Sequence, residues 1–252
     1  MKSFNKDELQ IKVFETRTEM GKASAADFAA AVKEVLKTKD SVRVVFAAAP
    51  SQEDFYSSAV ADKSIDFSKI DAFHMDEYIG LAKDAPQRFG NFLKDKIFKL
   101  RDFHSVSYIE PDESNPQASC DSYAKKLNEK PIDIVCMGIG ENGHIAFNDP
   151  GVADFNDPHD VKIVNLDDVC RMQQVHDKCF DSFDKVPQQA VTLTVPMLMK
   201  AKYHFCMVPA ATKANAVKKM LEGPIEASCP CTVLRTVPGS VLYLDADSSA
   251  LI

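Results

Sequence analysis

The segment at residues 138–144 carries residue types suited to proton transfer. It reads Gly-Ile-Gly-Glu-Asn-Gly-His and ends at His144. Glycines let a backbone turn sharply and approach a ligand closely, so Gly140 is expected to border a bound substrate. A histidine transfers protons near neutral pH, and Asp149 lies five residues further on, close enough in a turned segment to orient the imidazole. We therefore predict that His144 and Asp149 act together in catalysis.

Two other interpretations of this segment stay open. A histidine in a flexible surface turn needs no function. The spacing of Gly138, Gly140 and Gly143 also matches the GxGxxG motif of dinucleotide-binding proteins, which must open a helix. The Phe-Asn-Asp-Pro-Gly sequence at 147–151 interrupts any long helix, so dinucleotide binding is disfavoured.

Asp76 and Glu77 form a pair of adjacent carboxylates directly after an apolar run at 70–75. Carboxylates at the end of a strand can supply a general base. A solvated turn has the same composition and is the alternative. We take Asp76 as the candidate base and Glu77 as a candidate substrate contact.

Two further segments have features of an anion site. A tight turn into a helix exposes free N–H groups, and such a turn is expected after the apolar run at 41–47. The residues predicted to bind an anion there are Ala48, Ala49, Ser51 and Gln52. Lys213 stands at the start of a helical pattern at 212–221, where a cation opposes the helix dipole unless an anion joins it. An ordinary solvated lysine is the alternative.

These candidate segments follow strand-like runs. Apolar, β-rich runs occur at 41–47, 131–137, 202–208 and 240–244, with shorter ones at 70–75, 106–109 and 161–164. Helical patterns lie between them, at 25–36, 89–100, 115–128 and 212–221. This alternation predicts an α/β fold with a mostly parallel, twisted, Rossmann-like open sheet and helices on both faces. Ligands bind outside the carboxyl ends of such strands, where the candidate residues lie.

The composition limits the class of protein. The chain has 252 residues, 45% hydrophobic and 27% charged, and one α/β domain can occupy all of it. A net charge of -7 disfavours a nucleic-acid partner. No apolar run approaches the roughly 20 residues that span a bilayer, and the polar N-terminus does not resemble a signal peptide. Seven cysteines without a CxxC pair favour reduced thiols over a disulfide framework or zinc site, so we expect a cytoplasmic protein.

The order of these motifs resembles that of the glucosamine-6-phosphate deaminase/isomerase family, which shares its fold with the 6-phosphogluconolactonases. The resemblance extends from about residue 8 to the end of the chain. It is carried by the segments 73–81, 88–92, 138–150 and 186–194 and by the setting of Lys213. The lactonases share the loop that ends at His144 but lack the Met-Asp-Glu-Tyr stretch at 75–78 and the Ala-Phe-Asn stretch at 146–148.

The resemblance implies conversion of an amino-sugar 6-phosphate and water into a ketose 6-phosphate and ammonia, with no metal or organic cofactor. In this scheme His144 opens the sugar ring, Asp76 moves a proton between C2 and C1, and Asp149 holds His144. Asn142 belongs to the same catalytic group and stands where many family members have Asp. The family's phosphate-binding arginine lies in a lid, expected at about 165–186, where Arg171 is the first candidate and Lys178 the second.

The identity of the substrate is open at this point. Glucosamine 6-phosphate is the first expectation. The alternatives are galactosamine 6-phosphate, a lactone hydrolysed as in the 6-phosphogluconolactonases, and binding without turnover by a sugar-phosphate sensor. The altered phosphate loop at 48–52 and Asn142 motivate the last of these. The expected partner is a small sugar phosphate, and the chain is expected to be a monomer or a homo-oligomer.

Overall fold

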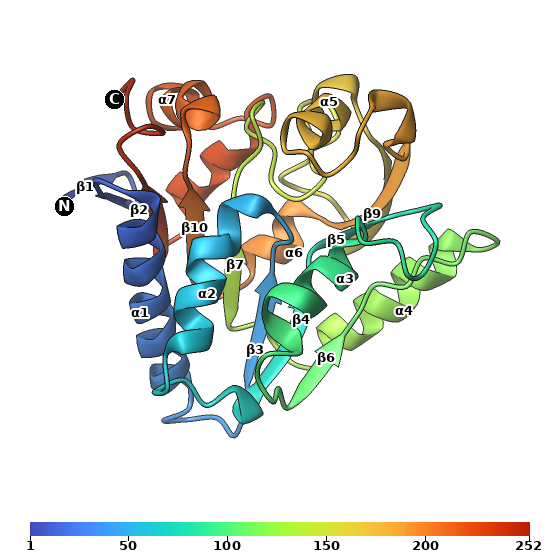
Figure 1. Cartoon of the computed structure of the whole chain (residues 1–252), viewed down its shortest axis with the longest axis horizontal. Helices are drawn as coiled ribbons and strands as arrows, with labels where there is room; N and C mark the ends of the chain where they lie inside the picture. Colours follow the sequence, from blue (N-terminus) through green and yellow to red (C-terminus); the bar gives the residue numbers. More distant parts are fainter.

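The computed structural model describes residues 1–252 and is built on an eight-stranded sheet in the order β1-β2-β11-β10-β7-β3-β4-β6 (Figure 1). Its strands are β1 (Lys2–Lys6), β2 (Leu9–Val13), β3 (Val42–Phe46), β4 (Ile70–His74), β6 (Ser105–Ser107), β7 (Ile134–Met137), β10 (Tyr203–Val208) and β11 (Ser240–Leu244). Only β1 and β2 pair in antiparallel fashion. The predicted mostly parallel sheet is therefore confirmed.

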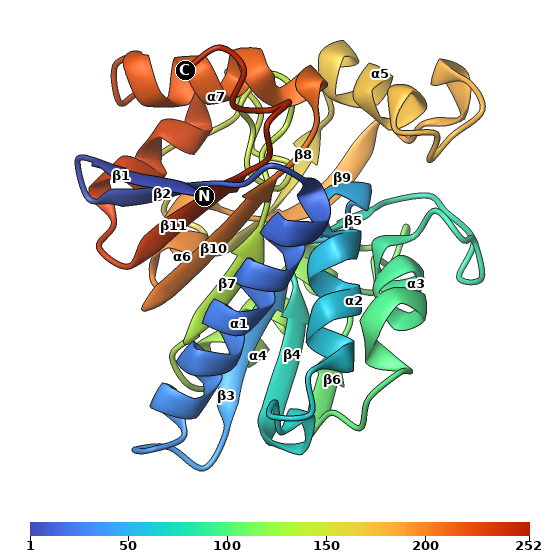
Figure 2. The ribbon, with the colours of Figure 1, turned by 60° about the vertical axis from the view of Figure 1, so that its left-hand side comes forward.

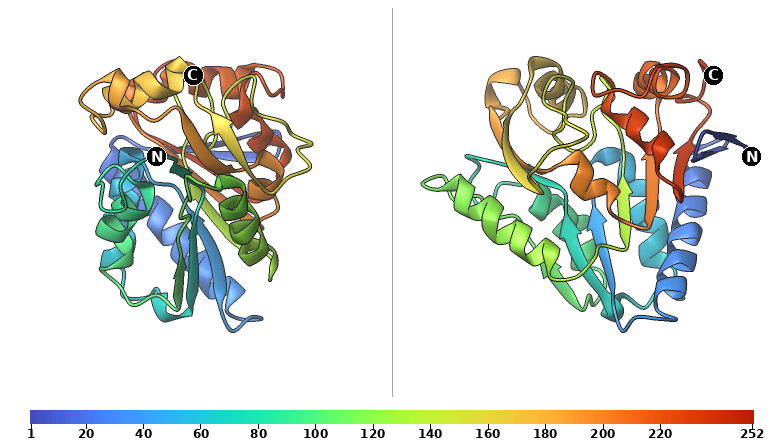
Figure 3. Two further views of the ribbon diagram at one scale, coloured as in Figure 1. Left: turned by 90° about the vertical axis from the view of Figure 1, so that its right-hand side faces the viewer. Right: turned by 180° about the vertical axis from the view of Figure 1, so that it is seen from behind.

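Helices cover both faces of this sheet. One face packs against α1 (Arg17–Val35), α2 (Glu53–Ala61) and α3 (Phe89–Leu93), and the other against α4 (Pro116–Asn128), α6 (Val195–Met199) and α7 (Ala214–Glu222) (Figures 2 and 3). Successive residues of a strand point to opposite faces. Accordingly Val44 and Phe46 of β3 pack in the core under α1, α2 and α3, and Val45 packs in the core under α4, α6 and α7. Both faces of the central strands are thus apolar, as the continuous apolar runs predict.

A second, smaller sheet stands beyond the carboxyl end of β4. It contains β5 (Asp76–Tyr78), β9 (Gln189–Leu193) and β8 (Val161–Asn165), all antiparallel. Asp76 pairs with Thr192 of β9. The segment that joins β8 to β9 contains α5 (Asp168–His176) and a short 3-10 helix, η4 (Phe183–Lys185). This segment covers the region where a lid is expected.

Several elements differ from the sequence-based expectations. The helix expected at 25–36 begins earlier, at Arg17, where the Thr16 side chain accepts a hydrogen bond from the Glu19 N–H and caps it. The helix expected at 89–100 is interrupted, because α3 passes into a π-helical turn at Lys94–Phe98. The wider turn brings the adjacent residues Ile97 and Phe98 both into the core. Strands β1, β2, β5 and β9 were not expected, and β1 shows no burial pattern because all five of its residues are exposed.

The sheet reverses its strand order between β3 and β7. From β3 the chain passes through α2 to β4, which lies next to β3 on one side. The next strand of the main sheet after β7 is β10, which lies next to β7 on the side away from β3. Connections that diverge in this way leave a crevice at the carboxyl ends of the two strands. None of the helices combines the length and the apolar character required to span a membrane.

Candidate active site

A pocket opens at the carboxyl ends of β3, β4, β7 and β10. It is bordered by the segments that follow these strands, at 47–51, 75–76, 138–140 and 209–213, and by residues of α5 and its end. The expected meeting of the segments after the strands is therefore observed. The structure brings Asp76, His144 and Lys213, which are far apart in the sequence, to one pocket.

Asp76 borders the pocket as the first residue of β5 and is almost fully buried. Burial raises the pKa of its carboxyl well above the ordinary value, and the neighbouring charge of Glu77 adds to the rise. No hydrogen bond from another protein group opposes this rise. A carboxylate whose pKa is moved toward neutrality is suited to accept and return a proton, as a general base must.

Glu77 does not border this pocket, although it is adjacent to Asp76. Successive residues of a strand point to opposite sides. The Glu77 carboxylate accepts hydrogen bonds from the N–H groups of Tyr78, Phe89 and Gly90, and lies 3.5 Å from the Arg88 guanidinium. The prediction that Glu77 contacts substrate is corrected to a structural role, because its oxygens already bind the start of α3.

His144 is held by two side chains of its own loop. Its Nδ1 lies 3.0 Å from Asp149 Oδ1 and 2.8 Å from Asn142 Oδ1. Asn142 Nδ2 donates to Asp149 Oδ1 at 2.9 Å, and Asn142 Oδ1 accepts the His144 N–H at 3.0 Å. With Nδ1 engaged as a donor, Nε2 is the nitrogen left for a substrate. Asn142 and Asp149 therefore position His144 and do not themselves border the pocket.

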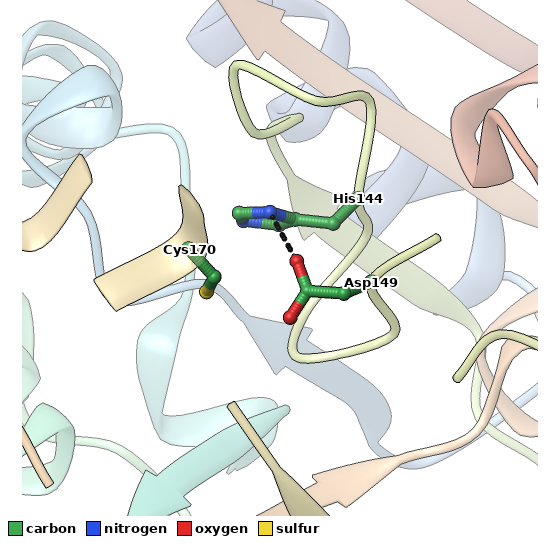
Figure 4. A group of neighbouring side chains, drawn as sticks. All are labelled: His144, Asp149 and Cys170. Atoms are coloured by element: carbon green, nitrogen blue, oxygen red, sulfur yellow. Dashed lines mark ion pairs between the residues drawn. The ribbon is translucent and has the colours of Figure 1, made fainter. Parts of the chain in front are cut away.

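Asp149 carries the negative charge of this group. Burial alone would raise the pKa of Asp149, but the hydrogen bond and charge of His144, with help from Asn142 and the Cys170 thiol, lower it. Cys170 approaches the pair from the lid helix α5 (Figure 4). One donor atom from each of His144, Asp149 and Cys170 lies within 4.8 Å of the others, so these are the residues that could hold a metal ion. The hydrogen bond from His144 to Asp149 accounts for their arrangement without one.

The lack of a side chain at Gly140 leaves the space that the His144 imidazole occupies. A Cβ atom built on Gly140 would lie 2.1–2.5 Å from three atoms of the His144 ring. Any side chain at this position would therefore displace the imidazole. The Gly140 N–H also donates to the His144 carbonyl at 2.9 Å, which closes the loop. The expectation that Gly140 borders the pocket agrees with the structure.

Free N–H groups and two cations line the same pocket and are of the kind that can bind an anion. The N–H groups of Ala48, Ala49 and Ser51 donate to no backbone carbonyl, as is usual where a strand passes into a helix. Lys213 is buried beside them along the pocket wall. Burial lowers the pKa of its ammonium group, and the nearby carboxylates of the lid and loop oppose this change. Arg17 also borders the pocket, and no feature of the sequence pointed to it.

Gln52 lies beneath the anion-binding loop and does not border the pocket. Its Nε2 donates to Ser51 Oγ at 3.0 Å and to the Met207 carbonyl at 3.2 Å, and the side chain is fully buried. The expectation that Gln52 binds phosphate is corrected on this point. Gln52 instead ties the loop after β3 to β10.

Arg171 points away from the pocket. Its guanidinium donates to the carbonyls of Phe183 and Val186 and stacks 3.9 Å from the Phe183 ring centre. The helix α5 presents Gln173, Gln174 and Asp177 to the pocket instead. Residues two apart on a helix differ by about 200° in direction, which separates Arg171 from Gln173. The expected role of Arg171 in phosphate binding is therefore corrected: in this structure it ties α5 to the segment at 183–186.

Gln173 was not expected at the site, and it connects α5 to the loop that carries His144. Its Oε1 accepts the Glu141 N–H at 2.8 Å, and its Nε2 donates to Asp177 Oδ2 at 3.3 Å. A glutamine on an amphipathic helix carries no signal of function in the sequence. Only the folded arrangement shows that it faces the pocket.

The fold and the site together define an α/β protein of an enzyme class, with a pocket at the strand switch point that brings together a histidine, a buried carboxylate and a buried lysine. The chain belongs to the family described as glucosamine-6-phosphate isomerases/6-phosphogluconolactonase, because the family pattern matches residues 15–243.

Individual relatives carry the names of one branch of this family. The glucosamine-6-phosphate deaminase of Lactobacillus delbrueckii subsp. bulgaricus is 30% identical over 97% of this chain and 100% of its own length. That of Oenococcus oeni is 34% identical over 77% of this chain and 80% of its own.

Solved structures show the same fold in both branches. A monomeric glucosamine-6-phosphate deaminase superposes with a TM-score of 0.88 at 25% identity, covering 96% of this chain and 99% of its own. The 6-phosphogluconolactonase of Thermotoga maritima superposes with a TM-score of 0.72 at 20% identity, covering 93% and 98% of the two chains. The second likeness concerns the fold alone.

Proposed function

We propose that this chain converts glucosamine 6-phosphate and water into fructose 6-phosphate and ammonia. The observation that carries the proposal is the presence of two separate proton-transfer groups, Asp76 and His144, on one pocket that also holds the free N–H donors of 48–51 and the cation Lys213. The names of the relatives and the higher structural similarity to a deaminase support the same branch.

Ring opening is assigned to His144. The Nε2 atom takes the proton of the sugar's O1 hydroxyl as the C1–O5 bond breaks, and the same proton passes to O5. Asp149 and Asn142 fix the ring through Nδ1, so that Nε2 keeps its direction while it is protonated. The products of this step are the open-chain aldehyde and a histidine returned to its starting form.

Isomerisation and loss of ammonia are assigned to Asp76. Its carboxylate takes the C2 proton, which leaves an enol-type intermediate, and returns a proton to C1. Water then adds to C2 and ammonia leaves, so that one water is consumed for each ammonia released. A buried carboxylate with a raised pKa holds such a proton more readily than an exposed one.

The phosphate is assigned to the anion-binding part of the pocket. The donors are the N–H groups of Ala48, Ala49 and Ser51, with Lys213 and Arg17 supplying positive charge. We further propose that residues 1–252 act as one catalytic domain, with the segment of about 165–186 as its lid. The contacts of Gln173 with Asp177 and with the N–H of Glu141 support the lid assignment.

Substitution of the base tests this function. Asp76→Asn should lower ammonia release from glucosamine 6-phosphate by about 10²- to 10⁴-fold, the usual contribution of one general base. Galactosamine 6-phosphate and 6-phosphogluconolactone are assayed beside it. Asp121→Asn on the exposed side of α4 serves as the matched control and should leave turnover unchanged.

The other functions of this fold give different results in the same assays. Hydrolysis of the lactone that survives Asp76→Asn would identify a lactonase. Preference for galactosamine 6-phosphate would revise the proposed substrate but keep the proposed deamination and isomerisation. Saturable binding of these sugar phosphates with no turnover of any of them by the unaltered chain would reject the proposed enzyme in favour of a sensor.

A further inference from the structure

Two cysteines lie side by side at the start of the 3-10 helix η6 (Pro230–Thr236). Cys229 and Cys231 are separated by Pro230, and their Sγ atoms are 3.6 Å apart. Both thiols are free. Residues two apart span at most about 7 Å between Cα atoms, and disulfides join Cα atoms about 4.4–6.8 Å apart. The two sulfurs are therefore within reach of a bond through small side-chain movements.

The same pair packs directly on the catalytic loop. The Cys231 N–H donates to the carbonyl of Gly143, the residue before His144, at 2.9 Å. A Cβ atom on Gly143 would lie 2.8 Å from Cys229 Sγ and 3.2 Å from Cys231 Sγ. Gly143 also has a φ of +85°, a conformation that favours glycine. The two sulfurs leave no room for a side chain at Gly143 and therefore pack directly against its backbone.

We propose that Cys229 and Cys231 form a thiol-modification site, at which a hydroperoxide produces a Cys229–Cys231 disulfide that moves Gly143 and slows the chemistry of His144. A disulfide brings its sulfurs to about 2.05 Å. The change from 3.6 Å is shared between two side chains packed on the loop. Misplacing a catalytic group by about 1 Å lowers a rate by as much as about 100-fold.

Cys229 reacts first with the peroxide, and Cys231 then closes the disulfide. Cys229 retains 8% exposure, whereas Cys231 has none, so Cys229 meets the oxidant. A hydrogen bond from the Cys231 thiol lowers the pKa of Cys229 against the opposing effect of burial, and the charge of Lys219 assists. The Cys229 thiolate attacks the peroxide oxygen, which gives a sulfenic acid and, after protonation, water. The Cys231 sulfur then attacks the sulfenic sulfur, its proton leaves with the hydroxyl as a second water, and the S–S bond forms.

The other cysteines lack this combination of features. Cys120, Cys136 and Cys206 are buried in the core, and none makes a sulfur–sulfur hydrogen bond. Burial raises the pKa of Cys179, in the lid, to about 11. Cys170 lies near His144 and Asp149, and is therefore a separate route by which an oxidant could affect activity. The experiment has to distinguish it from the pair.

The test combines thiol mapping with turnover. The full chain is treated with a small excess of hydrogen peroxide, and the peptides are examined by mass spectrometry after alkylation of free thiols. We expect a mass loss of two hydrogens in the peptide with residues 229 and 231, together with a fall in turnover of about 10- to 100-fold that dithiothreitol reverses. Cys229→Ser should resist inhibition, and the control Cys179→Ser should be inhibited like the unaltered chain.

The mapping arm is independent of the proposed deaminase activity, so failure of that activity and failure of the site are distinguishable. Absence of the 229–231 disulfide after peroxide treatment overturns the site. A disulfide that forms without a change in turnover overturns its coupling to His144. Equal inhibition of Cys229→Ser assigns the effect to another thiol, such as Cys170, and also overturns the proposal.

Discussion

Asn142 bridges the two members of the His144–Asp149 pair, as an acceptor from one and a donor to the other. A carboxylate at this position could accept from His144 but would repel the Asp149 carboxylate, because neither could donate to the other. The amide therefore suits this loop. The sequence alone raised doubt about Asn142, since the orientation of its amide depends on where Asp149 lies in space.

Gly140→Ala tests the packing of the imidazole. The added methyl group would overlap the His144 ring, so the ring must move, and turnover of glucosamine 6-phosphate should fall by about 100-fold. Gly151→Ala is the control. Its backbone is also unfavourable for alanine, at a φ of +87°, but a Cβ atom there meets nothing within 4 Å. It should reduce stability and leave kcat unchanged; equal losses of kcat in both variants would contradict the packing argument.

At the scale of elements, the orientation of side chains separates the residues that border the pocket from those that support it. Asp76 and Glu77 are adjacent on β5 and point to opposite sides, and Arg171 and Gln173 are two apart on α5 and do the same. The sequence motifs indicate Asp76, Glu77 and Arg171 as site residues but give no signal for Gln173. The phase of a three-residue strand or a nine-residue lid helix depends on tertiary packing, which short segments do not encode locally.

Arg171→Ala tests the assignment of this residue to the lid. The change removes hydrogen bonds to Phe183 and Val186, and should lower the free energy of unfolding by about 1–3 kcal/mol. Protection by inorganic phosphate in a thermal shift assay should persist in Arg171→Ala and be lost in Lys213→Ala. The reverse pattern would show that Arg171 binds the phosphate, as the resemblance to the family first implied.

The parallel sheet and its pocket were largely predictable, since continuous apolar runs and the segments after them depend on local patterns. The strands β5 and β9 were not. They pair with each other across more than a hundred residues of chain, and β9 also pairs with β8, so only tertiary pairing makes β5 a strand. Arg17 was missed for a similar reason, because α1 carries it to the pocket from the far end of the sequence.

At the scale of the whole molecule, burial of the Asp76 carboxylate lowers the free energy of unfolding. Burial raises the pKa of Asp76, so the unfolded chain holds its ionised carboxylate more easily than the folded chain does. The stability contributed by this residue therefore falls as pH rises above the ordinary value of 3.8 and remains reduced at neutral pH. Functional sites commonly carry such a penalty.

Asp76→Asn should consequently stabilise the protein while lowering turnover. At neutral pH we expect an increase of about 1–2 kcal/mol in the free energy of unfolding, measured with urea. The difference from the unaltered chain should shrink as pH falls toward 3.8 and vanish below it, because the carboxyl is then protonated in both states. A variant that is less stable at neutral pH would show that the Asp76 carboxylate has a stabilising partner.

The proposed lid, between β8 and β9, begins and ends at the same end of the β8–β9 hairpin. It leaves the small sheet after Asn165 of β8 and returns at Gln189 of β9, and these two residues face each other in the register. Strand β9 in turn pairs with β5, which carries Asp76. The paired ends of β8 and β9 therefore separate Asp76, the proposed general base, from changes within the lid. Changes between 166 and 188 that keep the contacts of Cys170 and Gln173 with the His144 loop can alter which substrates enter without moving Asp76, so selectivity can evolve with this part of the chemistry preserved.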